Sequence, residues 1–236
     1  YRFGLGLSYN GITGVMKDSR RDNIAGNIDL TYRLGKLNFV NKLSIQNTST
    51  SDPIVGFSSY ADANPYYAKY NEDGQVEKWL EYNDYTKAAN PLYNASLNSF
   101  TKSGSLSMSE KFNVEYMPIE AMRIRARLGY THTQGNGNSF VSPSDSRFIS
   151  TDYTKRGSYN HSENTSDKYE GELTVTYGKT FNEVHLMNIA AGGYISQTNS
   201  KNQGYSAVGF PEGDYTLPSF ANGYPEGGWL PDQKLT

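Results

Sequence analysis

Seven stretches of the chain alternate apolar and polar residues with a period of two, which is typical of strands that have one apolar face. The clearest is 122–133, where Met122, Ile124, Ala126, Leu128 and Tyr130 alternate with polar residues that include three arginines. The other predicted strands are 1–9, 23–32, 37–47, 104–116, 168–177 and 184–196. In 184–196 both sets of positions contain apolar residues, so the pattern leaves this strand unoriented. The chain is therefore predicted to be all-β.

The connections between these strands alternate between short and longer segments. Short turns are predicted at 33–36, 117–121 and 178–183, and longer connections at 10–22, 48–103, 134–167 and 198–236. In an antiparallel up-and-down sheet, successive connections lie at opposite ends, so the short turns share one end and the long loops share the other. Outer-membrane β-barrels have this layout, with brief periplasmic turns and long external loops.

The charges indicate which face of such a sheet would meet lipid. An outward arginine at the bilayer midplane costs about 2–4 kcal/mol, so the face with three arginines is expected to line the barrel interior. The residues expected on this lumen-facing wall are Lys111, Glu115, Arg123, Arg125, Arg127, Glu170 and Glu172. If Tyr116 pairs with Met122, Glu115 lies opposite Arg123 and Lys111 opposite Arg127. Wall structure and contact with a plug explain these charges better than a direct role with substrate.

Composition narrows the functional classes. The 236 residues contain 22 Lys+Arg and 24 Asp+Glu, a net charge of -2, which argues against a nucleic-acid binder. Cysteine is absent, which excludes disulfides and thiolate metal sites. No apolar run approaches the roughly 18 residues of a spanning helix, but a membrane barrel remains compatible because alternating strands average out as polar.

A soluble β-sandwich or repeat solenoid is the structural alternative, because sandwich strands also alternate. Two features count against it. The predicted strands, roughly 9–13 residues long, exceed the usual 5–6 and match the 9–11 that a bilayer requires. Loops of roughly 30–55 residues that alternate with turns of about 4–6 do not suit a compact sandwich.

Three segments carry a resemblance to a known family. The first runs from Tyr1 through Tyr9 to the paired arginines at 20 and 21, the second is Asn64-Pro65-Tyr66-Tyr67 through Gly74, and the third is Asn90-Pro91-Leu92-Tyr93. Together they resemble the barrel of SusC/RagA-like TonB-dependent outer-membrane transporters of the Bacteroidetes. The resemblance covers essentially the whole chain but only the central part of such a transporter.

The resemblance implies a 22-stranded transmembrane barrel with a plugged lumen in the outer membrane of a Gram-negative cell. It implies import of glycan oligosaccharides or peptides, a SusD-like lipoprotein lid as partner, and energy delivered by TonB through the plug. The plug region and the carboxy-terminal strand of the family have no counterpart in residues 1–236. Seven strands are about a third of such a barrel, so we expect a fragment or one part of a split polypeptide.

The long connections are rich in aromatic residues. One of them is Trp229, in the connection 198–236. The best candidates for substrate binding are Trp79, Tyr82, Asp84 and Tyr85, which are clustered with Glu81 and Asn83. Aromatic rings stack on the apolar faces of sugars while amides and carboxylates bind hydroxyls. The same mixture also suits a protein–protein rim or packing of the loop on itself. Whether the cargo is a glycan or a peptide stays open.

Motifs for catalysis or for a cofactor are lacking in the sequence. His132, His161 and His185 have no second ligand at metal-binding spacing. The segment 71–74 resembles the start of a calcium loop but lacks the downstream glutamate, so a turn is expected there. No nucleophile elbow or phosphate-binding loop is present. We therefore predict a protein that is not an enzyme and has neither a cofactor nor a metal.

Two other functions are alternatives to the transporter. One is a secreted all-β adhesin or glycan-binding module. The other is a glycan-active enzyme, because Glu170 and Glu172 are two carboxylates on one strand and a carboxylate pair can hydrolyse a glycoside. Nothing else in the sequence supports catalysis. A requirement for detergent would separate the transporter from both rivals.

Overall fold

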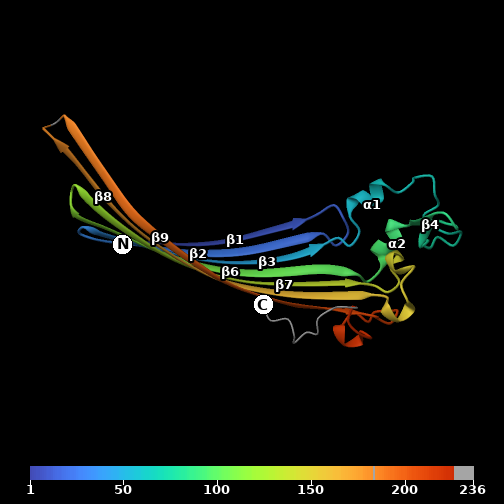
Figure 1. Cartoon of the computed structure of the whole chain (residues 1–236). Coiled ribbons are helices and arrows are strands. Elements are labelled where there is room, and N and C mark those ends of the chain that lie inside the picture. The colour runs from blue at the N-terminus through green and yellow to red at the C-terminus, as the bar shows by residue number, and fades with distance from the viewer. Residues whose placement is uncertain (183, 226–236) are drawn as a thin grey trace.

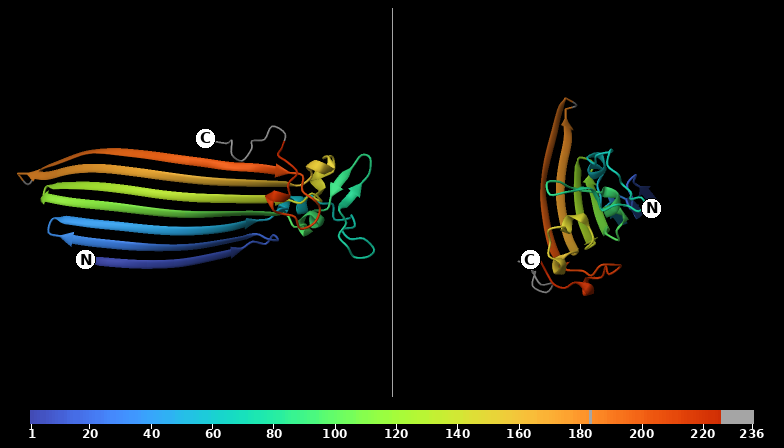
Figure 2. Two further views of the ribbon diagram at one scale, coloured as in Figure 1. Left: turned by 90° about the horizontal axis from the view of Figure 1, so that it is seen from below. Right: turned by 90° about the vertical axis from the view of Figure 1, so that its right-hand side faces the viewer.

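The computed structural model describes residues 1–182 and 184–225 and is dominated by one long, curved sheet (Figure 1). Its strands are β1 (Arg2–Thr13), β2 (Arg20–Leu34), β3 (Leu37–Asp52), β6 (Phe100–Ile119), β7 (Met122–Val141), β8 (Ser158–Phe181) and β9 (His185–Val208). They lie side by side in chain order, and every neighbouring pair is antiparallel (Figure 2). The predicted all-β, antiparallel up-and-down fold is confirmed, and β1 and β9 are the edges of the sheet.

The smaller elements all come from the longer connections. They are α1 (Phe57–Ala61), β4 (Trp79–Tyr82), β5 (Lys87–Ala89), α2 (Pro91–Ser96) and the 3-10 turns η1 (Ser146–Phe148), η2 (Tyr153–Lys155) and η3 (Pro218–Phe220). These elements gather at one end of the sheet, whereas the short turns lie at the other end (Figure 1). We call these the outer end and the turn end.

No helix in the described ranges is long and apolar enough to cross a membrane.

The strands extend further toward the outer end than the alternation predicts. Most of the predicted loop 134–167 is strand, because β7 and β8 pair from the turn end up to Val141 and Ser158. Strand β9 likewise continues to Val208 instead of ending at 196. Both faces are polar in these extensions, so the apolar period disappears while the backbone ladder continues. Part of the predicted loop 198–236, including Trp229, lies outside the described residues.

The hairpin between β6 and β7 corrects the predicted register. The ladder pairs Tyr116 with Ile124 and then shifts before Ile119 pairs with Met122. Pro118 lies within the shift, and because proline has no N–H to donate, it favours a bulge in a ladder. The predicted pairing of Tyr116 with Met122 is therefore wrong.

Correcting this register changes the cross-strand partners of the charged side chains. Glu115 lies opposite Arg125, and Lys111 lies opposite Gly129. In contrast, β8 and β9 pair without a shift, which orients the strand that the sequence left open.

One face of the sheet is apolar toward the turn end and exposed. Register places Phe3, Leu30, Asn41, Phe112, Leu128, Gly171 and Ile195 in one row across this apolar face. Leu128 is 60% exposed and Ile195 is 74% exposed. The opposite face, which carries the arginines of β7, is called the polar face below. No second layer covers the apolar row within the described residues, which is contrary to a sandwich.

The main buried cluster lies at the outer end instead. Phe140, Tyr159, Ala207 and Phe210 are buried together, and Phe100, Tyr205 and Ala221 pack against them. The Phe140 ring is fully buried and meets Phe210 edge-on, with 5.2 Å between the ring centroids. This core joins the ends of the strands to the segment that follows β9.

Candidate functional site

The polar face carries a band of paired charges toward the turn end. All seven residues predicted to line the wall lie on this face, because directly paired residues share a face. Glu115 Oε2 accepts a hydrogen bond from Arg125 Nη2 at 3.0 Å and lies 3.7 Å from Arg123 Nε. Arg127 Nη1 lies 3.2 Å from Glu172 Oε2. Half-exposed pairs of this kind each contribute about 0–1 kcal/mol, so the band determines the charge of the surface more than its stability.

A hollow interrupts this band on β6, β7, β8 and β9. Its volume is about 370 Å³, and its lining includes Lys111, Arg127, Gly129, Glu170 and Tyr194. Glu170 Oε1 accepts hydrogen bonds from Lys168 Nζ and from the Tyr194 hydroxyl, both at 2.8 Å. The hollow lies at position 129, where glycine provides no side chain between the strands that carry Lys111 and Glu170.

Toward the outer end, the polar face changes from charges to hydroxyl groups. Ser107 and Thr133 lie 3.3 Å apart through their hydroxyl oxygens, and Ser109 and Thr131 lie 3.2 Å apart. A second hollow of about 330 Å³ is lined by Thr48, Thr50, Ser103, Gly104, Ser105, Gly135, Asn136, Gly137, Ser162 and Asn164. Since none of these residues is charged, the two parts of the polar face offer different chemistry.

Of the predicted substrate-binding residues, the structure brings Trp79 and Tyr82 together. A bulge between Trp79 and Glu81 places the two rings on the same side of the β4–β5 hairpin, with centroids 5.4 Å apart. Asp84 and Tyr85 lie at the hairpin tip, where Tyr85 is 99% exposed and does not join the stack.

Neighbouring groups hold this hairpin in place. Lys78 Nζ lies 5.9 Å from the Trp79 ring centroid and 5.7 Å from that of Tyr93. The Tyr67 hydroxyl donates to Glu81 Oε2 at 2.5 Å, and this hydrogen bond raises the pKa of Tyr67 above its ordinary value. Much of the polar chemistry around Trp79 is thus used within the loop itself.

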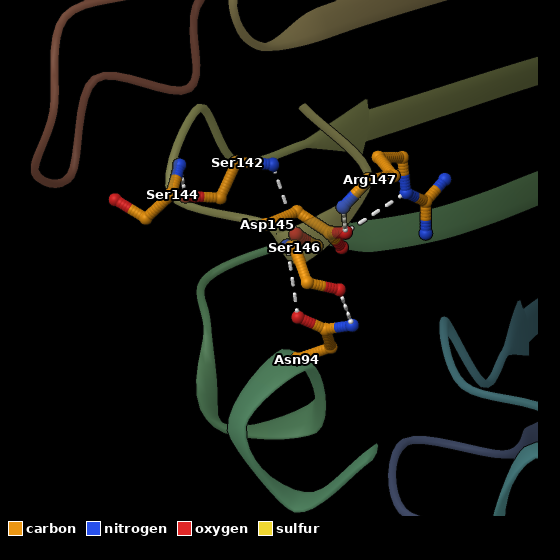
Figure 3. A network of polar contacts seen from close by, with 7 residues as sticks. Asn94, Ser142, Ser144, Asp145, Ser146 and Arg147 are labelled. Carbon is orange, nitrogen blue, oxygen red and sulfur yellow. Dashed lines mark hydrogen bonds and ion pairs between the residues drawn. The ribbon is translucent and has the colours of Figure 1, made fainter. Parts of the chain in front are cut away.

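A buried polar network joins the loop before β6 to the loop after β7 (Figure 3). Asn94 Nδ2 donates to Ser146 Oγ at 2.7 Å, and Asn94 Oδ1 accepts from the Ser146 backbone N–H at 3.1 Å. Asp145 is 1% exposed in its side chain, and its Oδ1 accepts from the backbone N–H and Nε of Arg147, both at 3.0 Å. The residue pattern gives no sign of this network, because Asn94 and Ser146 are 52 residues apart.

Asn90 anchors the same loop and is fully buried. Its Oδ1 caps α2 by accepting from Leu92 N at 3.1 Å, with Pro91 at the first helical position. Its Nδ2 donates to the carbonyls of Lys69 and Glu77 at 3.0 and 2.7 Å. The resemblance included this asparagine, and the structure shows what its side chain does.

A polar pair on the apolar face was likewise not predicted from the sequence. Glu110 is on the same face as Leu128, and its Oε1 accepts from Asn41 Nδ2 at 3.0 Å. Both residues interrupt the apolar alternation of their strands, at 110 within 104–116 and at 41 within 37–47. These interruptions are the signal that could have revealed the pair.

The histidines make local contacts with polar side chains. His132 Nδ1 lies 2.8 Å from Asp167 Oδ1, and His161 Nδ1 lies 2.7 Å from Asn138 Oδ1. No group of three or more His, Cys, Asp or Glu side chains that could hold a metal ion occurs among residues 1–182 and 184–225.

No protein-family model matches the chain, and no curated protein matches it. Solved structures do match. The RagAB peptide transporter structure superposes with a TM-score of 0.73 and 16% identity, over 94% of this chain and 25% of that chain. The RagAB peptide importer matches in its 'closed-closed' state (TM-score 0.68, 15% identity, 97% of this chain and 26% of that chain) and its 'open-open' state (0.71, 15%, 95% and 26%).

The chain therefore spans about a quarter of the length of the chains that it matches. At this identity, the likeness establishes the fold: the seven-stranded sheet has the arrangement of a segment of those transporter chains.

Proposed function

We propose that this chain forms part of the barrel wall of a TonB-dependent importer in the outer membrane of a Gram-negative, Bacteroidetes-like cell. The observation that carries the proposal is the exposed apolar face of the seven-stranded sheet. Leu5, Leu128 and Ile195 are 75%, 60% and 74% exposed on strands β1, β7 and β9. Apolar side chains in such a continuous band need an apolar environment, which lipid supplies to the outside of a barrel.

With the apolar face toward lipid, the polar face lines the lumen. The charged residues predicted for the wall then meet water, a plug or cargo, and the arginines avoid the cost of lipid. The outer end of the sheet stands outside the membrane, because its two faces are both polar there. The large loops at that end are where cargo and partners arrive.

The imported molecule is proposed to be a large nutrient, either a peptide or a glycan oligosaccharide. The matched RagAB structures are described as a peptide transporter and a peptide importer, which favours a peptide. The family resemblance adds a SusD-like lipoprotein lid over the loops and TonB acting through a plug. Trp79, Tyr82, Asp84 and Tyr85 are the loop residues that we propose contact cargo or lid.

Extraction of the intact protein tests the proposal directly. We expect it to fractionate with the outer membrane and to require detergent for solubility. We also expect uptake of its cargo to stop when TonB is deleted. An intact protein that stays soluble at high concentration without detergent would contradict the transporter and favour the secreted glycan-binding or adhesin module.

A further inference from the structure

The hollow on the polar face contains one cation without a bonded partner. Lys111 donates no hydrogen bond and forms no ion pair within residues 1–182 and 184–225, and its charge acts on Glu170 only through space across the hollow. The register also places Lys42 directly opposite Lys111, and like charges at paired positions destabilise a sheet. An anion next to Lys111 would relieve this repulsion, while its other cross-strand neighbour, Gly129, offers none.

The far side of the hollow presents a carboxylate with one oxygen still available. Both hydrogen bonds that Glu170 accepts within the described residues, from Lys168 and Tyr194, go to Oε1. A Cβ built at Gly129 would lie 3.7 Å from Glu170 Oε2, so this second oxygen borders the empty position. In contrast, Glu172 uses both oxygens, Oε2 toward Arg127 and Oε1 toward Thr174.

Lys111 and Glu170 are thus complementary to a ligand with two opposite charges. They occupy one row of the ladder, with Gly129 between them, so their backbones are two strand spacings or roughly 10 Å apart. Both residues line the hollow, and Glu170 borders the position that a side chain at 129 would fill. The hollow of about 370 Å³ falls within the usual size of ligand pockets.

We propose that the hollow over Gly129 is a binding site for a zwitterion of the amino-acid or short-peptide class. Its carboxylate binds the Lys111 ammonium, and its ammonium binds Glu170 Oε2. This inference rests on the proposed import function, and it selects peptides over glycans because an uncharged oligosaccharide has neither group. The site lies within the charged band, away from the aromatic hairpin of Trp79.

Calorimetry on the intact transporter in detergent tests the site with alanyl-alanine as the probe. Its N-acetylated form lacks the ammonium, and its carboxamide form lacks the carboxylate. We expect the zwitterion to bind about tenfold more tightly than either capped form, since a charge-assisted hydrogen bond is worth about that factor.

Matched variants assign each charge to its residue. In Lys111→Met the preference for the free carboxylate should disappear while that for the free ammonium remains, and Glu170→Gln should show the reverse. Gly129→Leu should abolish binding by filling the hollow without changing any charge. Arg33→Met, which removes a cation from the same face nearer the turn end, should bind like the unchanged protein.

Equal affinity for the zwitterion and its capped forms would overturn the site, and so would unchanged binding by Lys111→Met and Gly129→Leu. Absence of binding in the intact transporter would also overturn it, because the rest of the protein would then fill the hollow. Uptake measured in parallel keeps the two proposals apart. TonB-dependent uptake without charge preference contradicts only the site, whereas a protein that is soluble without detergent contradicts the import function.

Discussion

The two halves of the long strands differ in how their faces are used. Near the turn end, the faces are opposite in character, with Leu128 on one side and its neighbour Arg127 on the other. Near the outer end, both faces are polar until the strands reach the small core around Phe140. The same ladder therefore crosses two environments, and each half depends on a different source of stability. The turn end depends on its surroundings, whereas the outer end supplies its own packing.

Phe140→Ala should have the largest effect, and it should be confined to the outer end. The ring is fully buried, and truncation of a buried phenylalanine costs about 3–5 kcal/mol. We expect the loops after β7 and β9 to become sensitive to protease on intact cells while the amount of protein assembled in the membrane stays the same. Phe112→Ala, on the apolar face near the turn end, serves as control and should leave the loops resistant.

Leu128→Arg should disrupt assembly of the half of the sheet near the turn end. An arginine facing lipid costs about 2–4 kcal/mol at the midplane, so we expect a markedly lower yield of folded protein in membranes. Arg127→Leu changes the neighbouring residue on the polar face and should assemble far better. Heat-modifiability on gels measures the folded fraction, and similar yields for the two variants would contradict the assignment of the faces.

The contrast between the two halves of the strands also explains which strand segments could be predicted from the sequence. The alternation orients β7 because its apolar residues, such as Leu128, and its charged residues, such as Arg127, differ greatly in hydropathy. The same strand from Gln134 to Ser139 contains only Gln, Gly, Asn and Ser, so a polar face cannot be told from its opposite and the stretch is predicted as a loop. The backbone hydrogen bonds that extend the strand leave no trace in such a pattern.

The candidate site depends on register, which the sequence determines only weakly. The bulge at Pro118 moves Gly129, instead of Arg127, opposite Lys111, and the hollow exists only in that register. Likewise, Trp79 and Tyr82 share a side only because of the bulge in β4. Pro118 favours a bulge but does not specify how far the register shifts, and no residue in 79–82 marks the bulge in β4. The charged residues could thus be predicted, but their pairing could not.

Asn90→Ala tests whether the outer loops are fixed as firmly as the outer core. The change removes the Asn90 donor from the Glu77 carbonyl and leaves the Lys69 carbonyl with only the Glu77 backbone N–H, and an unsatisfied buried polar group costs about 1–3 kcal/mol. Hydrogen exchange should accelerate in residues 53–98 and stay unchanged in the strands of the seven-stranded sheet. Asn98→Ala, whose amide is exposed and donates to Gly213 O, should have little effect. Equal exchange in the two variants would mean that Asn90 does not organise the loop.

The smallest expected effect is a pH dependence at the η2 turn. Asp152 Oδ1 accepts hydrogen bonds from the Thr154 hydroxyl at 2.5 Å and from the Thr154 backbone N–H at 2.8 Å, and these bonds lower the pKa of Asp152 below its ordinary value. A lowered folded-state pKa gives stability that is present above the ordinary aspartate range of about 3.9 and is lost as the pH falls through the lower folded value. Hydrogen exchange at 153–156, corrected for intrinsic rates, should therefore rise on acidification below about pH 4.

Asp152→Asn separates this titration from the general effect of acid. The amide oxygen still accepts from the backbone of Thr154 but cannot be protonated in this range, so the acid-dependent rise should be smaller than in the unchanged protein. Because Asp152 lies at the outer end, exchange in β7 near Leu128 should not respond in either protein. A rise at 153–156 that is identical in both would show that another group loosens the turn.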